Sequence, residues 1–169
     1  MNDPANPCTV RPATSDDAAR VAGIYNHYVQ HTAISFEETP VSGDEMGNRI
    51  AKITRAGLPW LVAEHEGRVI GHAYAGPWRE RAAYRFAVEC TVYTAADHQG
   101  RGIGGALYRT LFERLAQGGW HTVLAVIALP NAASVALHEK FGLRKVAHFA
   151  EVGWKFGRWH DVGNWQRLL

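Results

Sequence analysis

Apolar residues recur along the chain with two different periods. In four segments they lie three and four positions apart, which is the spacing of one helix face. Ser15 is the expected cap of the first segment, and Ser42 with Glu45 has the spacing of a capping box at the start of the second. The third segment ends at Gly118-Gly119, a common helix stop. Helices are therefore predicted over residues 15–29, 42–55, 104–117 and 131–140.

Shorter extended runs lie between the helical segments. Two of them, residues 60–64 and 69–75, predict a hairpin whose turn is formed by residues 65–68. A third run, residues 122–128, is apolar enough for a strand at the centre of a sheet. The element order is β-α-α-β-β-β-α-β-α-β-β, which predicts an α/β fold with one mixed sheet and helices on both faces. The predicted strands are residues 9–11, 60–64, 69–75, 84–93, 122–128, 143–149 and 159–168.

Composition narrows the class of protein. A chain of 169 residues with 47% hydrophobic and 20% charged residues is expected to form one domain, residues 1–169. The net charge is only +2 and the basic residues are scattered, which argues against a nucleic-acid partner. No apolar run approaches the length that spans a membrane, and the first seven residues, polar with two prolines, are unlike a secretory signal.

The cysteines and histidines carry little further chemistry. Cys8 and Cys90 are far apart and lack metal-ligand spacing, so both are expected to be reduced thiols in a cytoplasmic protein. His27 and His31 are four residues apart, but no third ligand accompanies them, and no metal site is expected.

A glycine-rich stretch between a strand and a helix is the most informative motif. Glycines remove Cβ atoms, and the free N–H groups of the first helical turn then point at an anion such as a phosphate. A P-loop is excluded because no Lys-Ser or Lys-Thr pair follows, and a dinucleotide fingerprint because position 122 is Thr, not an acid. The alternative is a helix cap without a ligand, but a cap needs only one glycine. The candidate anion-binding residues are Gln99, Gly100, Arg101, Gly102, Ile103, Gly104 and Gly105.

The pattern Arg/Gln-x-x-Gly-x-Gly over residues 99–104 resembles the pyrophosphate loop of the GNAT N-acetyltransferases. Residues 72–78, 88–93, 131–139 and 157–166 are similar to a narrower branch, the phosphinothricin, methionine sulfoximine and methionine sulfone N-acetyltransferases. The resemblance extends from about residue 9 to 167. It implies the GNAT (acyl-CoA N-acyltransferase) fold, acetyl-CoA as co-substrate and a homodimer. It also implies direct acetyl transfer, in a ternary complex, to the α-amine of a small amino acid.

Two side chains are candidates for proton transfer. Glu89 is an acid inside an otherwise apolar strand, where burial would raise its pKa and suit it to act as general base. The alternative for Glu89 is a structural carboxylate paired with Arg79 or Arg85. His138 stands where many GNAT enzymes carry a tyrosine thought to protonate the leaving thiolate. Its imidazole could donate a proton or orient a water, or it could be a hydrogen-bonded helix histidine.

The remaining candidates are binding residues. The backbone of Val92, Tyr93 and Thr94 is expected to hold the pantetheine arm like an added strand. Asn131 either caps the last helix or, with Ser134, also contacts the coenzyme, as the resemblance implies. Cys90 should lie on the face of its strand opposite Glu89, which disfavours a cysteine nucleophile. The resemblance further suggests an amino-acid pocket formed by Phe36, Trp78, Arg79, Tyr84, Val88 and Glu89.

Several points stay open at this level. His160 and Asp161 are adjacent and are interpreted as a hydrogen-bonded pair beside the pocket. The sequence does not rank phosphinothricin, methionine sulfoximine and methionine sulfone. Two alternative functions are acetylation of another small amine and a non-catalytic acyl-CoA sensor, and an intact Glu89 argues against the sensor.

Overall fold

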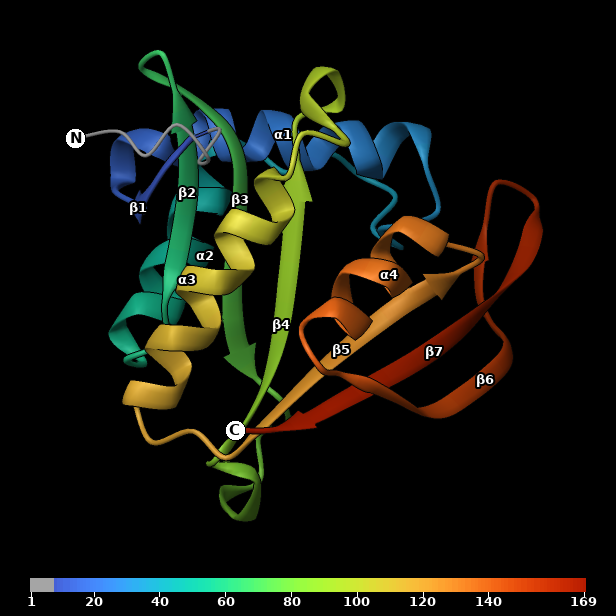
Figure 1. Cartoon of the computed structure of the whole chain (residues 1–169). Helices are drawn as coiled ribbons and strands as arrows, with labels where there is room; N and C mark the ends of the chain where they lie inside the picture. Colours follow the sequence, from blue (N-terminus) through green and yellow to red (C-terminus); the bar gives the residue numbers. More distant parts are fainter. Residues whose placement is uncertain (1–7) are drawn as a thin grey trace.

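The computed structural model of the protein describes residues 8–169, so the polar segment 1–7 lies outside the described residues. One twisted sheet separates two layers of helices (Figure 1). The strands are β1 (Thr9–Pro12), β2 (Trp60–His65), β3 (Arg68–Pro77), β4 (Ala87–Thr94), β5 (Thr122–Leu129), β6 (Arg144–Lys155) and β7 (Arg158–Leu168). The helices are α1 (Ala18–His31), α2 (Gly43–Arg55), α3 (Ile103–Gln117) and α4 (Ala132–Lys140). This is the predicted element order.

The sheet is mixed, as expected. Its strand order is β1-β2-β3-β4-β5-β7-β6. All neighbouring pairs are antiparallel except β4 and β5, which are parallel and joined through α3. The single parallel pair therefore lies in the middle of the sheet, where one crossover helix covers it.

Alternation along the strands divides the core into two halves. On β2, Leu61 and Ala63 pack against the apolar side chains of α3, while Trp60 and Val62 pack against those of α1 and α2. Neighbouring residues of a strand face opposite sides of a sheet, so one strand supplies both cores. The expectation of helices on both faces is confirmed.

The sheet opens at its centre, because β4 and β5 separate soon after they pair. Their register covers only Ala87–Glu89 of β4 against Thr122–Leu124 of β5. Beyond this point β4 continues beside β3, and β5 continues beside β7. The divergence is visible in Figure 1, where the upper end of β4 points away from that of β5. It exposes the backbone of both strands between α3 and α4.

Several predicted boundaries were wrong for local reasons. Ser15 is not a helix cap but lies inside a short 3₁₀ turn (Ser15–Asp17) that precedes α1. The N-cap of this turn is Thr14, whose N–H donates to the Asp17 carboxylate at 2.8 Å. The hairpin turn, by contrast, spans residues 65–68 as predicted: its central residues Glu66 and Gly67 have φ of 50° and 74°, the combination of a type I′ turn. The expected strand start at residue 84 is a 3₁₀ turn, Ala82–Tyr84, and β4 begins at Ala87.

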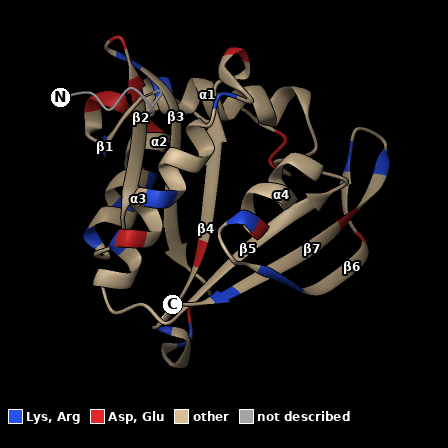
Figure 2. Ribbon diagram, viewed as in Figure 1, with Lys and Arg blue, Asp and Glu red and all other residues tan. Residues whose placement is uncertain are grey.

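Charged residues are spread over the whole molecule, as the scattered basic residues of the sequence predict. Figure 2 shows acidic and basic residues interspersed over helices and strands. No helix within residues 8–169 is long and apolar enough to cross a membrane.

Candidate functional site

The glycine-rich stretch forms a turn at the start of α3. Gly100 and Gly102 have φ of 73° and 80°, which favours glycine, and Gly102 is the N-cap of the helix. The first N–H groups of α3 have no partner within the helix, and the positive end of its dipole lies behind them. Ile103 is buried and anchors the turn in the core. The turn therefore has the geometry of an anion site.

A groove of about 430 Å³ runs from this turn along the end of β4. Arg101 is exposed and is not part of the groove wall, and the other predicted coenzyme residues are brought together there. Among them, Asn131 caps α4 by accepting the Ser134 N–H at 3.1 Å. The predicted residues that line the groove are Val92, Tyr93, Thr94, Gln99, Gly100, Gly102, Ile103, Gly104, Gly105, Asn131 and Ser134.

Tyr28 of α1 fixes one wall of the groove. Its hydroxyl donates to the Thr94 carbonyl, and Gln99 Nε2 donates to that hydroxyl at 3.0 Å. Tyr28 falls on the apolar face of a helix far away in the chain, so no sequence pattern marks it as a binding residue.

A second hollow of about 420 Å³ adjoins the groove. The two share Ile34, Val92, Tyr93, Asn131 and Ser134 as lining residues and are therefore continuous. This hollow is lined by Glu89 from β4, His138 from α4 and Tyr108 from α3. It occupies the place where β4 and β5 have separated.

Glu89 is a half-buried carboxylate in the hollow. Burial raises its pKa, which would place proton uptake closer to neutral pH. Arg79 lies over the Trp78 ring and Arg85 over the Phe86 ring, and no ion pair joins either to Glu89 within residues 8–169. The alternative interpretation of Glu89 as a structural partner of these arginines is therefore wrong.

His138 is buried and its two ring nitrogens have different roles. Nδ1 lies 2.7 Å from the Ser134 carbonyl, which only accepts, so Nδ1 carries the proton. Nε2 must then accept, and the Tyr108 hydroxyl donates to it at 2.8 Å. Burial lowers the pKa of His138, which keeps the ring neutral. The imidazole proton is thus held by a carbonyl, and burial raises the pKa of Tyr108 well above its ordinary value, so both groups of the pair are neutral at neutral pH.

Tyr108 and Cys90 complete this side of the hollow. Sequence reasoning missed Tyr108, because it is one of several apolar positions on the buried face of α3. Cys90 is buried among the α3-facing core residues, and burial raises its thiol pKa to about 12. A thiolate nucleophile is therefore excluded at neutral pH.

The loop between α1 and α2 closes the hollow on the opposite side. Ile34, Ser35, Phe36 and Glu37 line it, so the expectation that Phe36 reaches this hollow agrees with the structure. The Tyr25 hydroxyl lies 2.7 Å from Ser35 Oγ and donates to Glu37 at 2.8 Å. Arg49 donates to the other side of this network.

The Arg49 guanidinium sets the charge of Glu37. It donates through Nη1 at 2.6 Å and through Nη2 at 3.2 Å, which is a bidentate contact with the carboxylate. This contact lowers the pKa of Glu37. Glu37 therefore stays ionised and fixed in the wall of the hollow at neutral pH.

Four expected pocket residues do not line the hollow around Glu89. Val88 is fully buried in the α3-facing core, because alternation turns it away from Glu89. Trp78, Arg79 and Tyr84 line a separate hollow of about 730 Å³. Tyr74 is the one described residue that lines both this hollow and the hollow around Glu89.

The predicted His160–Asp161 pair is also absent. His160 Nε2 contacts the Lys155 carbonyl at 3.1 Å, and Asp161 contacts His148 at 2.7 Å. Adjacent strand residues face opposite sides of the sheet, which prevents the pair. Cys8 and Cys90 form no disulfide in this structure, and both are buried. Among the described residues, no three His, Cys, Asp or Glu side chains gather as metal ligands do.

Comparison with known proteins places this geometry in a family. The model of the acetyltransferase (GNAT) family matches residues 23–143. The chain is 43% identical to the phosphinothricin N-acetyltransferase of Streptomyces viridochromogenes, over 99% of this chain and 91% of that protein. It is 40% identical to an L-methionine sulfoximine/L-methionine sulfone acetyltransferase of Salmonella typhimurium, over 91% of this chain and 90% of that protein.

A solved structure has the same architecture. A GNAT superfamily phosphinothricin acetyltransferase from Sinorhizobium meliloti, in complex with acetyl-CoA, superposes with a TM-score of 0.94 and 39% identity, over 97% of this chain and 89% of that one. The family match, the two relatives and the shared fold lead to one conclusion: the chain belongs to the acetyltransferase (GNAT) family.

Proposed function

We propose that the protein transfers the acetyl group of acetyl-CoA to the α-amine of a small amino acid whose side chain carries a tetrahedral phosphorus or sulfur group. The observation that supports this most is the position of Glu89. It is a half-buried carboxylate without an ion-pair partner among the described residues, in a hollow continuous with the glycine-lined groove. Phosphinothricin, methionine sulfoximine and methionine sulfone are the substrate types named for the relatives.

The groove suits acetyl-CoA by its chemistry. The N–H groups at the start of α3 would hold the diphosphate, and the open edge of β4 at Val92 to Thr94 would pair with the amides of the pantetheine arm. The thioester would then enter the hollow between β4 and β5. The proposed reaction uses acetyl-CoA and the amino acid as its two substrates and no metal.

Glu89 takes the first proton in this mechanism. The ammonium group of the amino acid gives a proton to the Glu89 carboxylate, directly or through water, and the free amine attacks the thioester carbonyl carbon in a ternary complex. The raised pKa of Glu89 makes it a better acceptor than an exposed carboxylate. A backbone N–H near Val92 would polarise the thioester carbonyl.

Tyr108 and His138 act on the leaving group, the thiolate of coenzyme A. The C–S bond breaks as the amide forms, and the leaving thiolate needs a hydrogen-bond donor and finally a proton. The Tyr108 hydroxyl, 2.8 Å from His138 Nε2, would give its proton to the thiolate and take, directly or through water, the second proton that the attacking nitrogen loses. The phenol then ends neutral, which agrees with a Tyr108 pKa that burial raises well above its ordinary value. His138 acts through Tyr108, since its own proton is held by Ser134.

The proposal extends to assembly and location. The β6–β7 hairpin exposes a row of large apolar side chains, and such surfaces are typical of protein interfaces. A second copy of the chain is the proposed occupant, forming a homodimer, and two free buried thiols are consistent with a reducing cytoplasm. Neither nucleic acid nor a membrane is a proposed partner. The exposed apolar residues are Val146, Phe149, Val152, Trp154, Phe156 and Trp159.

A thiol-release assay tests the function. Acetyl-CoA is incubated with the protein and a panel of phosphinothricin, methionine sulfoximine, methionine sulfone and unmodified amino acids. We expect kcat/KM to be highest for one of the three tetrahedral side chains. Turnover confined to other amines would overturn the substrate assignment, and tight coenzyme binding without any turnover would indicate a sensor.

A further inference from the structure

A lysine ammonium group is buried at the end of the β6–β7 hairpin. The Lys155 residue is 3% exposed, and its Nζ donates to the Val29 carbonyl at 2.7 Å and to the Ser35 carbonyl at 2.6 Å. No carboxylate forms an ion pair with it within residues 8–169. Burial lowers the pKa of Lys155. Burying a cation costs free energy unless its hydrogen bonds are satisfied. The two carbonyl oxygens therefore stabilise the ammonium group in this one position.

The two carbonyls belong to different parts of one wall. Val29 lies in the last turn of α1, so its carbonyl has no partner within the helix and carries part of the negative end of the dipole. Ser35 lies in the loop that lines the hollow around Glu89. Lys155 therefore joins the end of α1 and the loop to a hairpin more than a hundred residues away.

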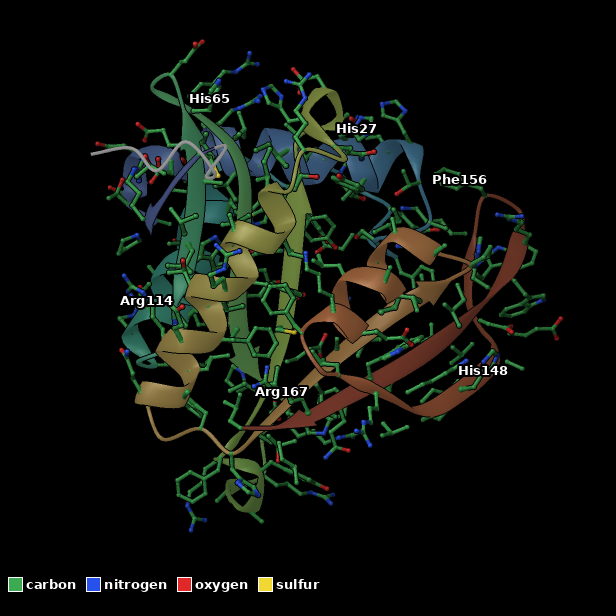
Figure 3. The ribbon with its side chains drawn as sticks, viewed as in Figure 1. His27, His65, Arg114, His148, Phe156 and Arg167 are labelled. Atoms are coloured by element: carbon green, nitrogen blue, oxygen red, sulfur yellow. The ribbon has the colours of Figure 1, made fainter. Side chains whose placement is uncertain are left out.

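A second contact joins the same loop and hairpin. The Phe36 ring packs directly on Gly153, and a Cβ at that glycine would lie 2.3 Å from the ring. In Figure 3 the labelled Phe156, which follows Lys155, lies at the tip of the hairpin, close to the segment after α1. The loop thus has a hydrogen bond from a charged donor and a packing contact with the hairpin.

The groups that these contacts fix are polar and face the hollow. Ser35 Oγ and Glu37 share the Tyr25 hydroxyl, and Glu37 is an ionised carboxylate in the same hollow as Glu89. A shift of the loop would move this carboxylate relative to Glu89. It would not move the glycine turn, which is held by the core of α3.

We propose that Lys155 is a positioning residue for the amino-acid substrate: its ammonium group fixes the loop around Ser35, Phe36 and Glu37 against the β6–β7 hairpin and so shapes the acceptor side of the hollow. This inference rests on the proposed N-acetyltransferase function. It concerns the acceptor alone, because none of the contacts of Lys155 involves the groove beside α3.

The test uses the full chain with Lys155→Met, which keeps most of the side-chain length and removes the three donors. Lys145→Met is the matched control, since Lys145 is on the same strand but contacts only exposed groups and the face of Trp165. We expect Lys155→Met to raise the KM for the amino acid at least tenfold and to leave the KM for acetyl-CoA within twofold of wild type. A merely structural role would lower the melting temperature without this split.

Gly153→Ala perturbs the same contact without changing a charge, and it decides the question if Lys155→Met does not fold. Gly23→Ala is its control, because nothing lies within 4 Å of a Cβ there. We expect Gly153→Ala to raise the amino-acid KM and Gly23→Ala to leave it unchanged. An unchanged amino-acid KM in Gly153→Ala, or in a folded Lys155→Met, overturns the proposal for Lys155. Absence of turnover in the wild type overturns the proposed function instead.

Discussion

The two halves of the candidate site differ in how they are built. On the coenzyme side, the anion-binding turn within the groove is one contiguous stretch, residues 99–105, with a backbone that two glycines make possible. On the acceptor side, the wall depends on contacts between α1, α2, the loop after α1 and the end of β6. The anion-binding turn is a local structure, and the acceptor wall is a tertiary one.

This difference has consequences for perturbation. A local anion site should lose affinity for the coenzyme when its own backbone is strained. Substitutions elsewhere in the chain should leave that affinity unchanged. An assembled pocket should respond to residues that never touch the substrate, because their contacts set its shape. Glu89 lies where the two halves meet, so its loss should affect turnover of the bound substrates more than the binding of either.

The largest effect is expected for Glu89→Gln. Loss of a general base should lower kcat by about 10²- to 10⁴-fold, with both KM values within a few-fold of wild type. Steady-state kinetics with each substrate varied in turn measures this. Because burial raises the pKa of Glu89, the acidic limb of the wild-type kcat profile should lie above the ordinary carboxylate range. An unchanged kcat in the variant would remove Glu89 from the mechanism.

Stability should change in the opposite direction to activity. A carboxylate with a raised pKa in the folded state binds its proton more tightly there, so its ionisation above that pKa destabilises the fold. Glu89→Gln removes this penalty, and its melting temperature at neutral pH should equal or exceed that of wild type. A large drop in melting temperature would mean that the loss of kcat reports misfolding.

The next effect is expected for Gly102→Ala and should be confined to the coenzyme side. A left-handed residue with a side chain costs about 1–2 kcal/mol, and relief of that strain would distort the turn. We expect the KM for acetyl-CoA to rise about tenfold and the amino-acid KM to stay constant. Gly119→Ala is the matched control, since Gly119 has φ of 75° at the far end of α3. Equal effects of both variants on acetyl-CoA would refute a binding role for the turn.

A smaller effect is expected for Glu37→Gln, on the acceptor side. The substitution removes the charge that Arg49 and Tyr25 stabilise, and a hydrogen bond to a charged group contributes about 1.5–3 kcal/mol. Because only part of this affects the substrate, we expect the amino-acid KM to rise about fivefold with an unchanged acetyl-CoA KM. Glu113→Gln, at an exposed position of α3, is the control. If acetyl-CoA binding changed as well, the two halves would be coupled.

What the sequence could predict follows the same division. The glycine turn is contiguous, and Glu89 stands out as an acid within an apolar strand, so both were found without a structure. The element order was also predictable, because the hydrophobic periods of helices and strands are local.

The rest depends on contacts distant in the chain. Tyr108 and Tyr28 look like ordinary core positions of helices, and only the packing of α4 and β4 gives their hydroxyls a partner. Lys155 looks like an exposed lysine until the end of α1 is placed beside it. Trp78 and Arg79 line a different hollow from Glu89, which could not be predicted because no period along the chain reveals how the loop after β3 turns.

The smallest effect concerns His72, which lies beneath the acceptor side and touches neither substrate site. Its ring is fully buried between Trp60 and Tyr93, and neither ring nitrogen has a hydrogen-bond partner among the described residues. Burial lowers its pKa to about 3. The unfolded chain binds a proton at His72 below about pH 6.5, whereas the folded chain does not until about pH 3. The stability that this group contributes is therefore present above pH 6.5 and lost as the pH falls.

His72→Phe removes this titration and keeps a ring in the stack. Between pH 6 and 5 the free energy of unfolding of wild type should fall relative to the variant by about 1.4 kcal/mol per pH unit, as measured by urea denaturation. His65→Phe, at an exposed position of the same hairpin, should follow the wild-type slope, and both variants should keep wild-type KM values at pH 7.5. Parallel pH dependence in wild type and His72→Phe would mean that His72 is protonated in the folded protein. An altered amino-acid KM in His72→Phe would show that the layer beneath the acceptor pocket also shapes it, and the acceptor half would then extend through the sheet.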